Sequence, residues 1–270
     1  MTEPERAALE HIRQVVDSVI GKPAAEPLPA GSEEAGARVS LLPVPYVSQF
    51  GEGADQFSND TGAAAGAMLV GAYTERAVTP DDFFKQSGQQ SDVPLSLAQI
   101  AAVLAANGVA VEQRNGLKLG ELALVLSTGR PALALVKYAV LQQAGLAPET
   151  YSGAHYLVAV GLDVKNIYVH DPFRYDASGR GQAIPWLVFY QAWSQAPELE
   201  RAALIPRLPL LRRVAVTSAS LKIYKEPAES AEVAGTARAG DVYEVMILKE
   251  GWGKVGEGLW ISMKGVMDIF

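Results

Sequence analysis

Apolar residues recur at helical spacing near the start of the chain. The row that runs from Ala8 to Ile20 falls on one face of a helix, which predicts a short amphipathic helix over residues 3–20. From 21 to 38 the chain is dominated by Pro, Ala, Gly, Ser and Glu and shows no apolar period, a composition typical of a flexible linker. We therefore expect the first folded domain to begin near Leu41.

The next apolar segments predict helices with recognisable starts. The run 61–73 is rich in Ala, Met and Leu and predicts a buried helix, opened by the capping residues Asn59 and Asp60. A second helix is expected to open at Thr79, because Pro80 would occupy its first turn, where proline is favoured. The small residues of the first helix indicate close packing against its neighbours.

Three more helices are predicted further along. Ser96 with Gln99 three residues later has the pattern of a capping box, and Gly108 would close that helix. Residues 119–126 predict another helix, and 184–193 have the spacing of the last one.

Strands alternate with and follow these helices. Residues 132–137 form an apolar run that predicts a buried strand, and the segments 155–163 and 166–172 predict a hairpin. Helices therefore dominate the first part of this region and antiparallel strands the second, which indicates the α+β class.

The pattern changes from about Val214 to short β-branched and apolar runs separated by EP, AG, EG and GEG turns, which predicts a small all-β barrel. The Leu- and Pro-rich stretch 196–213 is expected to pack across the first domain before the barrel begins. We divide the chain into a helix and linker (1–40), an α+β domain (41–200), a connector (201–213) and the barrel (214–270).

Composition narrows the classes of function. With 270 residues, 49% of them hydrophobic, the chain can bury a sizeable core. A net charge of −7 argues against a nucleic-acid partner. No apolar run reaches the roughly 20 residues of a membrane span, and no classical signal peptide is visible, so a cytoplasmic location is the default expectation.

The content of cysteine and histidine narrows the possible classes of function further. The absence of cysteine excludes disulfides and thiolate chemistry, and three histidines without an HExxH or EF-hand motif argue against a catalytic metal. We expect no cofactor.

Three residues could form a catalytic arrangement. Thr61 opens a helix, where the helix dipole favours a nucleophile; His155 begins a strand and could act as its base; Asp171 ends the next strand and could orient the imidazole. His170 is expected to point to the other side of its strand. A threonine hydroxyl stays protonated where a thiol would ionise, and an internal threonine lacks the N-terminal amine on which threonine nucleophiles generally rely.

The ordered set resembles the bacteriocin-processing (double-glycine leader) peptidase-like family of papain-fold cysteine peptidases, over about 41–196. In that family a Gln helps to form the oxyanion hole, a Cys-Gly supplies the nucleophile, a Gly-His begins a strand and an Asp-Pro ends the next. Here Gln49, Thr61, His155 and Asp171 occupy those places in that order. The resemblance implies a papain-like fold and a bacterial or phage origin, and it departs from the family where threonine replaces cysteine.

Two further assignments stay open. Gln56 is a rival to Gln49 for the oxyanion position, because it lies nearer to Thr61 in sequence. The segment 214–270 resembles a bacterial SH3-like domain, which implies peptidoglycan or peptide binding. Its aromatic residues could line a groove or pack in the core of the barrel: Tyr243, Trp252 and Trp260.

Three functions compete. The first is a non-catalytic peptidase-like protein that binds a peptide or peptidoglycan-type ligand, with the terminal module supplying a second contact. The second is a cysteine peptidase or amidase with Cys-His-Asp chemistry whose cysteine was replaced by engineering. The third is a slow hydrolase that uses Thr61 as nucleophile and His155 as base.

Overall fold

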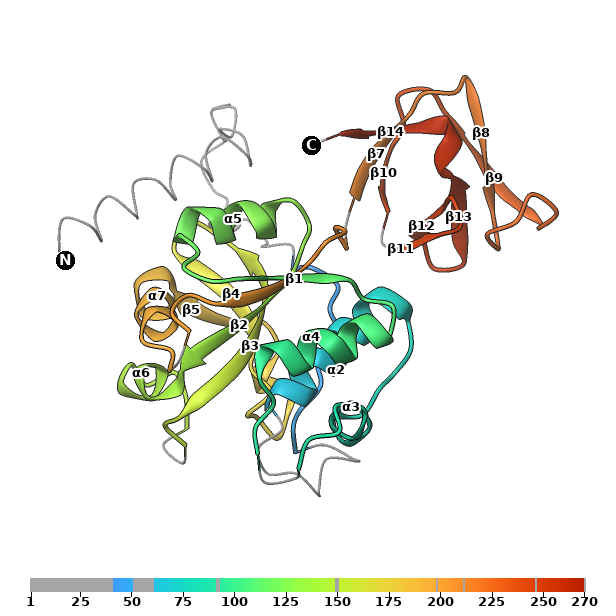
Figure 1. Ribbon diagram of the computed structural model, residues 1–270. Helices are drawn as coiled ribbons and strands as arrows, with labels where there is room; N and C mark the ends of the chain where they lie inside the picture. The colour runs from blue at the N-terminus through green and yellow to red at the C-terminus, as the bar shows by residue number, and fades with distance from the viewer. Residues whose placement is uncertain are drawn as a thin grey trace, which may run out of the picture.

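The computed structural model describes residues 41–50, 61–90, 93–148, 151–197, 199–210, 212–245 and 247–269 (Figure 1). The predicted helix 3–20, the linker 21–38, and the residues Gln56, Asn59 and Asp60 lie outside this part of the chain. No helix within it is long and apolar enough to cross a bilayer.

One six-stranded antiparallel sheet organises the first unit, in the order β1-β6-β2-β3-β4-β5. Its strands are β1 (Val111–Arg114), β2 (Ala132–Lys137), β3 (Ala154–Leu162), β4 (Asn166–His170), β5 (Gln182–Pro185) and β6 (Ala203–Pro206). Because β2 and β3 lie in the middle of the sheet, their apolar runs are buried on both faces.

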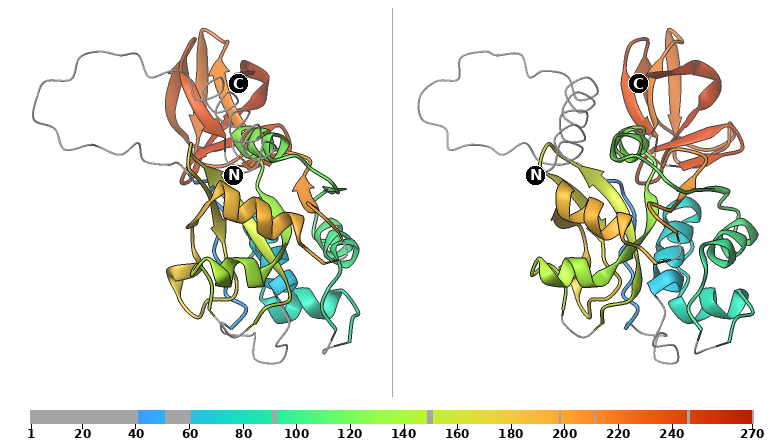
Figure 2. Two further views of the ribbon diagram at one scale, coloured as in Figure 1. Left: turned by 90° about the vertical axis from the view of Figure 1, so that its left-hand side faces the viewer. Right: turned by 60° about the vertical axis from the view of Figure 1, so that its left-hand side comes forward.

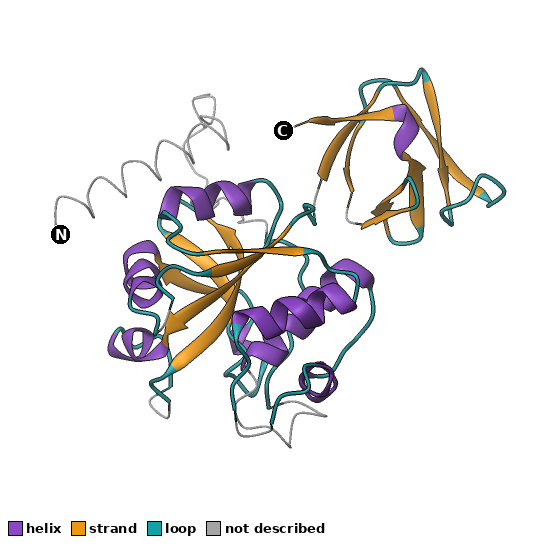
Figure 3. Ribbon diagram, in the orientation of Figure 1, coloured by secondary structure: helices purple, strands orange, loops and turns teal. Residues whose placement is uncertain are grey.

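Helices cover both faces of this sheet (Figures 1 and 3). They are α2 (Thr61–Thr74), α3 (Pro80–Gln86), α4 (Leu97–Ala106), α5 (Leu119–Ser127), α6 (Tyr138–Gln143) and α7 (Trp186–Ser194). Helices α2 to α4 lie on one side of the sheet and α6 and α7 on the other, with α2 against β3 and α7 against β2 (Figure 2). The predicted α+β class is confirmed.

Local capping chemistry sets the starts of two helices. Thr79 accepts a hydrogen bond from the Asp82 N–H at the start of α3. Ser96 and Gln99 form the predicted capping box of α4, which ends at Ala106 before Gly108. These starts were predictable because a side-chain oxygen must replace the missing partners of the first helical N–H groups.

Two boundaries differ from the sequence-based prediction. The last helix begins at Trp186, not Ile184, because Ile184 pairs with Ile167 and so belongs to β5. Strand β6 lies within the predicted connector 201–213 and pairs with both β1 and β2. In both segments, pairing with distant strands determines the secondary structure, which the local sequence had indicated as the start of a helix or as a connector.

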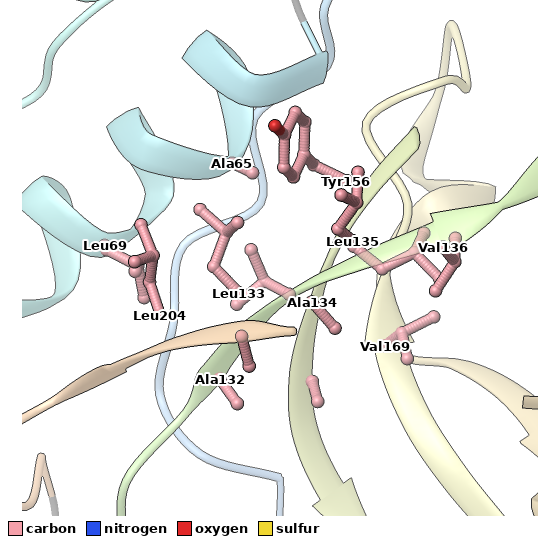
Figure 4. Close-up of a cluster of buried hydrophobic side chains, with 14 of the residues drawn as sticks. Ala65, Leu69, Ala132, Leu133, Ala134, Leu135, Val136, Tyr156, Val169 and Leu204 are labelled. Carbon is pink, nitrogen blue, oxygen red and sulfur yellow. The ribbon is translucent and has the colours of Figure 1, made fainter. Parts of the chain in front are cut away.

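Small residues let α2 approach β3 and α3 closely. Ala65 and Leu69 of α2 face Leu133 and Leu135 of β2 in the core (Figure 4). Gly66 lies against α3, and a Cβ built there would come within 2.7 Å of the Phe83 Cε1. The stretch of small residues is therefore a packing feature that brings Thr61 close to the sheet.

The terminal unit consists of two antiparallel sheets, β10-β7-β14 and β11-β12-β13-β8-β9. Its strands are β7 (Arg212–Val216), β8 (Ser220–Tyr224), β9 (Val233–Arg238), β10 (Val242–Val245), β11 (Ile247–Lys249), β12 (Trp252–Gly256), β13 (Leu259–Ser262) and β14 (Val266–Ile269). The all-β prediction is confirmed. Neither sheet closes on itself among the described residues, so a closed SH3-like barrel stays a prediction.

Replacement of Gly66 by alanine should destabilise the protein. The added methyl group overlaps three atoms of the buried Phe83 ring, which places the cost in the upper part of the overpacking range, roughly 2–3 kcal/mol, and the roughly 1 kcal/mol gained in helix propensity offsets only part of it. We expect urea unfolding to give a loss of about 1–2 kcal/mol. Gly235→Ala is the control, because its new Cβ meets only Ile223 Cδ1 at 3.7 Å. A Gly66→Ala protein as stable as its parent would contradict this packing.

Candidate active site

Thr61 lies at the junction between a helix and the central sheet. It is the first residue of α2, is 8% exposed, and its Oγ1 accepts a hydrogen bond from the Tyr156 N–H at 3.4 Å. Tyr156 follows His155 on β3, so this bond brings the hydroxyl to the strand that carries the imidazole. The positive end of the 14-residue helix dipole lies at Thr61.

Strand register brings His155 and Asp171 together. Val158 of β3 lies opposite His170 of β4, so Asp171 and His155 both project from the other face of this pair. The His155 Nε2 is 2.7 Å from the Asp171 Oδ1, and both side chains are almost entirely buried. The structure thus brings these two side chains into contact, while the base and orienting roles expected for them stay predictions.

The Asp171 carboxylate has further partners. Tyr138 donates its hydroxyl to Oδ2 at 2.7 Å, and the Phe173 N–H donates to Oδ1 at 3.0 Å. Burial alone would raise the pKa of Asp171, but the attraction of His155 and these hydrogen bonds outweigh it and lower the pKa. The carboxylate is therefore ionised at neutral pH and can orient the imidazole.

The second ring nitrogen of His155 remains available. Within the described part of the chain, His155 Nδ1 has no hydrogen-bond partner. The Tyr138 ring covers the imidazole at a centroid distance of 4.2 Å, and the Phe173 edge lies 6.0 Å away. Asp171 thus holds Nε2, and Nδ1 is the ring nitrogen that the described residues leave without a hydrogen bond.

Gln49 shares a pocket with Thr61. Its side chain is 1% exposed, and its backbone N–H donates to the Pro172 carbonyl at 3.0 Å. Ser48 is tied to the same loop through its hydroxyl, which donates to the Arg174 carbonyl at 2.5 Å. The segment that carries Gln49 is thus fixed to the loop after Asp171, and the oxyanion role of Gln49 stays a prediction.

The pocket has a volume of about 400 Å³, within the range of roughly 300–1,000 Å³ common for small-ligand sites. Uncharged side chains line it: Gln49, Thr61, Gln89, Val93, Pro94, Leu95, Ser96, Gln99, Leu135, Tyr151, Ala154, Tyr156, Phe173 and Pro197. In the described ranges no group of three or more His, Asp or Glu side chains could hold a metal ion.

His170 has a structural environment on the opposite side of β4. Its Nε2 lies 2.9 Å from the Val44 carbonyl, and the Gly181 N–H donates to Nδ1 at 3.0 Å. The ring is therefore neutral, with its proton on Nε2, and burial lowers its pKa. The predicted orientation away from Asp171 is confirmed.

The three aromatic residues proposed for a groove in the terminal unit are not brought together. Tyr243 packs with Val214 in the core between the two sheets. Trp260 is 8% exposed, and the Lys254 Nζ lies over its ring. On the neighbouring strand Tyr224 lies opposite Trp260 and contacts the ring of Trp252. Of the two alternatives, Tyr243 follows the core packing, and the outward face of the five-stranded sheet carries Tyr224 beside Trp252 and Trp260.

Sequence reasoning missed Tyr138 and Phe173. Tyr138 directly follows the buried strand β2, and an aromatic hydroxyl at the end of a central strand was the feature that could have drawn attention to it. Phe173 follows the Asp-Pro pair by one residue, but its backbone N–H bond to Asp171 depends on a loop conformation that spacing does not specify.

The chain is similar to several known proteins in sequence or in structure. The model of the Peptidase_C39 like family matches residues 41–199. A protein described as a C39-like peptidase from Bacillus anthracis aligns with a TM-score of 0.46 and 13% identity, over 64% of this chain and all of its own. Ly7917 aligns with a TM-score of 0.29 and 14% identity, over 94% of this chain and 90% of its own. The structure of Ly7917 with the hydrolysis product of MDP aligns with a TM-score of 0.27 and 14% identity, over 95% of this chain and 91% of its own. No curated protein matches in sequence.

Tyr138→Phe should weaken the fold through Asp171. The variant keeps the ring against His155 but removes the hydroxyl from a buried carboxylate oxygen, which costs about 1–3 kcal/mol at pH 7. The pKa of Asp171 is lower in the folded protein than its value of about 3.9 in the unfolded chain, so its ionised form stabilises the fold above that pH. This stabilisation is lost as the pH falls through the pKa of the folded protein. The difference between variant and parent in urea unfolding should therefore shrink below about pH 4.

Tyr168→Phe is a matched control for this experiment. Tyr168 also donates its hydroxyl to an aspartate, Asp163, but in a half-buried hairpin. Its removal should cost only about 0.5–1 kcal/mol. Equal losses in the two variants would contradict a special role for burial at Asp171.

His170 should make stability depend on pH between about 5 and 7. Its folded pKa is lowered, so the unfolded chain binds a proton below about pH 6.5 that the folded chain rejects, and stability falls as pH falls. The slope of unfolding free energy against pH should drop in His170→Gln by up to about 1.4 kcal/mol per pH unit. An unchanged slope would show that His170 does not titrate in this way.

Proposed function

The chain belongs to the Peptidase_C39 like family, and from this premise we propose that it binds peptide-type ligands at a peptidase-like site that has lost covalent catalysis. The single observation behind the proposal is the hydroxyl of Thr61 at the start of α2, bonded to the N–H of Tyr156 on the strand that carries the buried His155 of the His155–Asp171 pair. The ligand is a peptide or the peptide part of a peptidoglycan-type polymer.

The chemistry of Thr61 supports the loss of catalysis. A thiol at a helix start beside an imidazole has a pKa below its usual value of about 8.5 and reacts as a thiolate, whereas an aliphatic hydroxyl must lose its proton during attack. The Thr61 Oγ1 also accepts a hydrogen bond from the Tyr156 N–H, and its γ-methyl group restricts χ1. Both constraints hold the oxygen in a packing position.

The retained binding geometry supports a ligand. His155 and Asp171 are buried and hydrogen-bonded, and such a pair is costly to keep in a core unless its partners are satisfied. Gln49 and Thr61 still line a pocket of about 400 Å³. A site with this shape can hold an extended chain without cleaving it.

A second candidate is a slow hydrolase that uses Thr61 with His155 as base. One observation favours it: His155 Nδ1 has no hydrogen-bond partner within the described ranges. The alternative of an engineered cysteine replacement leads to the same site with a thiol, and the variant below reconstructs it.

We infer that the terminal unit adds a second contact, as an SH3-like module would. Trp252 and Tyr224 contact each other edge to face at 5.2 Å on the face of the five-stranded sheet that points away from its own core. Lys254 on the same face forms an ion pair with Glu75, next to the end of α2. Two weak sites joined in this way raise affinity through effective concentration.

Thr61→Cys should restore a reactive nucleophile. The natural chain has no cysteine, so a thiol-directed electrophile reports only on the introduced residue. We expect Cys at position 61 to react at pH 6 at least about tenfold faster than Cys in Thr74→Cys, at the other end of the same helix, because the helix dipole and His155 lower its pKa. Equal rates would contradict an intact His155–Asp171 site.

Peptide cleavage separates the candidates. With a peptide library, the natural protein should bind without turnover, while Thr61→Cys should cleave. Turnover by the natural protein that is lost in Thr61→Ala would establish the hydrolase instead, and the absence of any binding would refute the proposed function.

A further inference from the structure

One wall of the pocket presents an oriented amide. Gln99 Oε1 accepts hydrogen bonds from the Ser96 N–H and the Ser96 hydroxyl, both at 2.9 Å. A backbone N–H can only donate, so the Gln99 atom that faces it must be the oxygen and the amide cannot be flipped. The capping box of α4 thus decides which way this side chain points.

The nitrogen of the same amide is left for a ligand. Gln89 Nε2 also approaches Gln99 Oε1, at 3.5 Å, so the oxygen is occupied by three donors. Among the described residues no acceptor pairs with Gln99 Nε2, and the side chain lines the pocket together with Gln89 and Ser96. Both Nε2 hydrogens can therefore serve an acceptor that enters the pocket.

Tyr156 connects this wall to Thr61. Its hydroxyl donates to the Leu95 carbonyl at 2.8 Å, next to Ser96, while its backbone N–H donates to Thr61 Oγ1. One residue of β3 therefore fixes the distance between the amide donors and the helix start. Because both anchors are buried, the wall is preorganised.

The described residues that line the pocket are uncharged, which favours an uncharged ligand segment. No Asp, Glu, Lys or Arg is among the described residues that line it. A charged side chain that entered would lose its hydration and gain no counter-charge from these described residues, whereas carbonyl oxygens would meet amide donors and apolar side chains would meet Leu95 and Leu135. The lining therefore suits an uncharged, carbonyl-rich segment.

We propose that Gln99 is a specificity-determining residue that donates hydrogen bonds to a backbone carbonyl of a bound peptide whose segment in the pocket carries no charged side chain. This inference rests on the proposed peptide-binding function and names the class of ligand for the same site.

The test uses the full chain and an immobilised library of peptides in which one position is Leu, Gln, Glu or Lys. The natural protein should bind the Leu and Gln peptides at least about tenfold more tightly than the Glu and Lys peptides. This comparison needs no variant, so it does not depend on any substitution folding.

Gln99→Glu should change that preference. Glutamate also serves in capping boxes, so the bond from the Ser96 N–H and the start of α4 are kept, but the two donors are replaced by a carboxylate oxygen. We expect binding of the Leu and Gln peptides to fall about tenfold or more and binding of the Lys peptide to rise. Gln113→Glu, an exposed residue of β1 that does not line the pocket, makes the same change in net charge and should leave the preference unaltered.

The outcomes distinguish a failure of the role proposed for Gln99 from a failure of the proposed peptide binding. Equal binding of charged and uncharged peptides by the natural protein, or an unchanged profile in Gln99→Glu, overturns the role of Gln99 while peptide binding stands. If no library peptide binds the natural protein, the proposed function fails and this inference fails with it.

Discussion

The contact between His155 and Asp171 is the interaction on which the rest of the site depends. Burial of an imidazole and a carboxylate is costly, and their mutual hydrogen bond offsets part of that cost. The carboxylate also accepts the Tyr138 hydroxyl and the Phe173 N–H, and the Arg174 Nε lies 3.8 Å from it. Through these contacts β2, β3 and the loop after β4 converge at one point. The same convergence positions Thr61, since α2 packs on β3 through residues too small to keep it at a distance.

Much of this arrangement was predictable from sequence. Local signals have local causes: the Ser96–Gln99 capping box, the Thr79–Pro80 helix start and the apolar run of β2 each act within a few residues. The opposite orientations of His170 and Asp171 follow from strand alternation alone. The order of Thr61, His155 and Asp171 along the chain suggested a shared site, but whether the three lie within reach of one another could not be read from the sequence.

Non-local pairing accounts for what the sequence could not reveal. Strand β6 joins β1 and β2 across long stretches of chain, and no local pattern within 201–213 specifies those partners. Tyr243 and Tyr224 both lie on strands with alternating exposure, and only the stacking of the two sheets decides that Tyr243 faces the core. The Tyr138 bond to Asp171 likewise joins residues 33 positions apart.

Binding and catalysis place different demands on this site, and the structure separates them. Covalent catalysis needs a nucleophile, and a hydroxyl at position 61 would have to give its proton to a base during the attack. Binding needs shape and oriented donors, which come from many residues; Tyr156 joins the helix start to the wall that carries Gln99. The Thr61 hydroxyl accepts the Tyr156 N–H, so the residue at position 61 also takes part in the packing of α2 against β3.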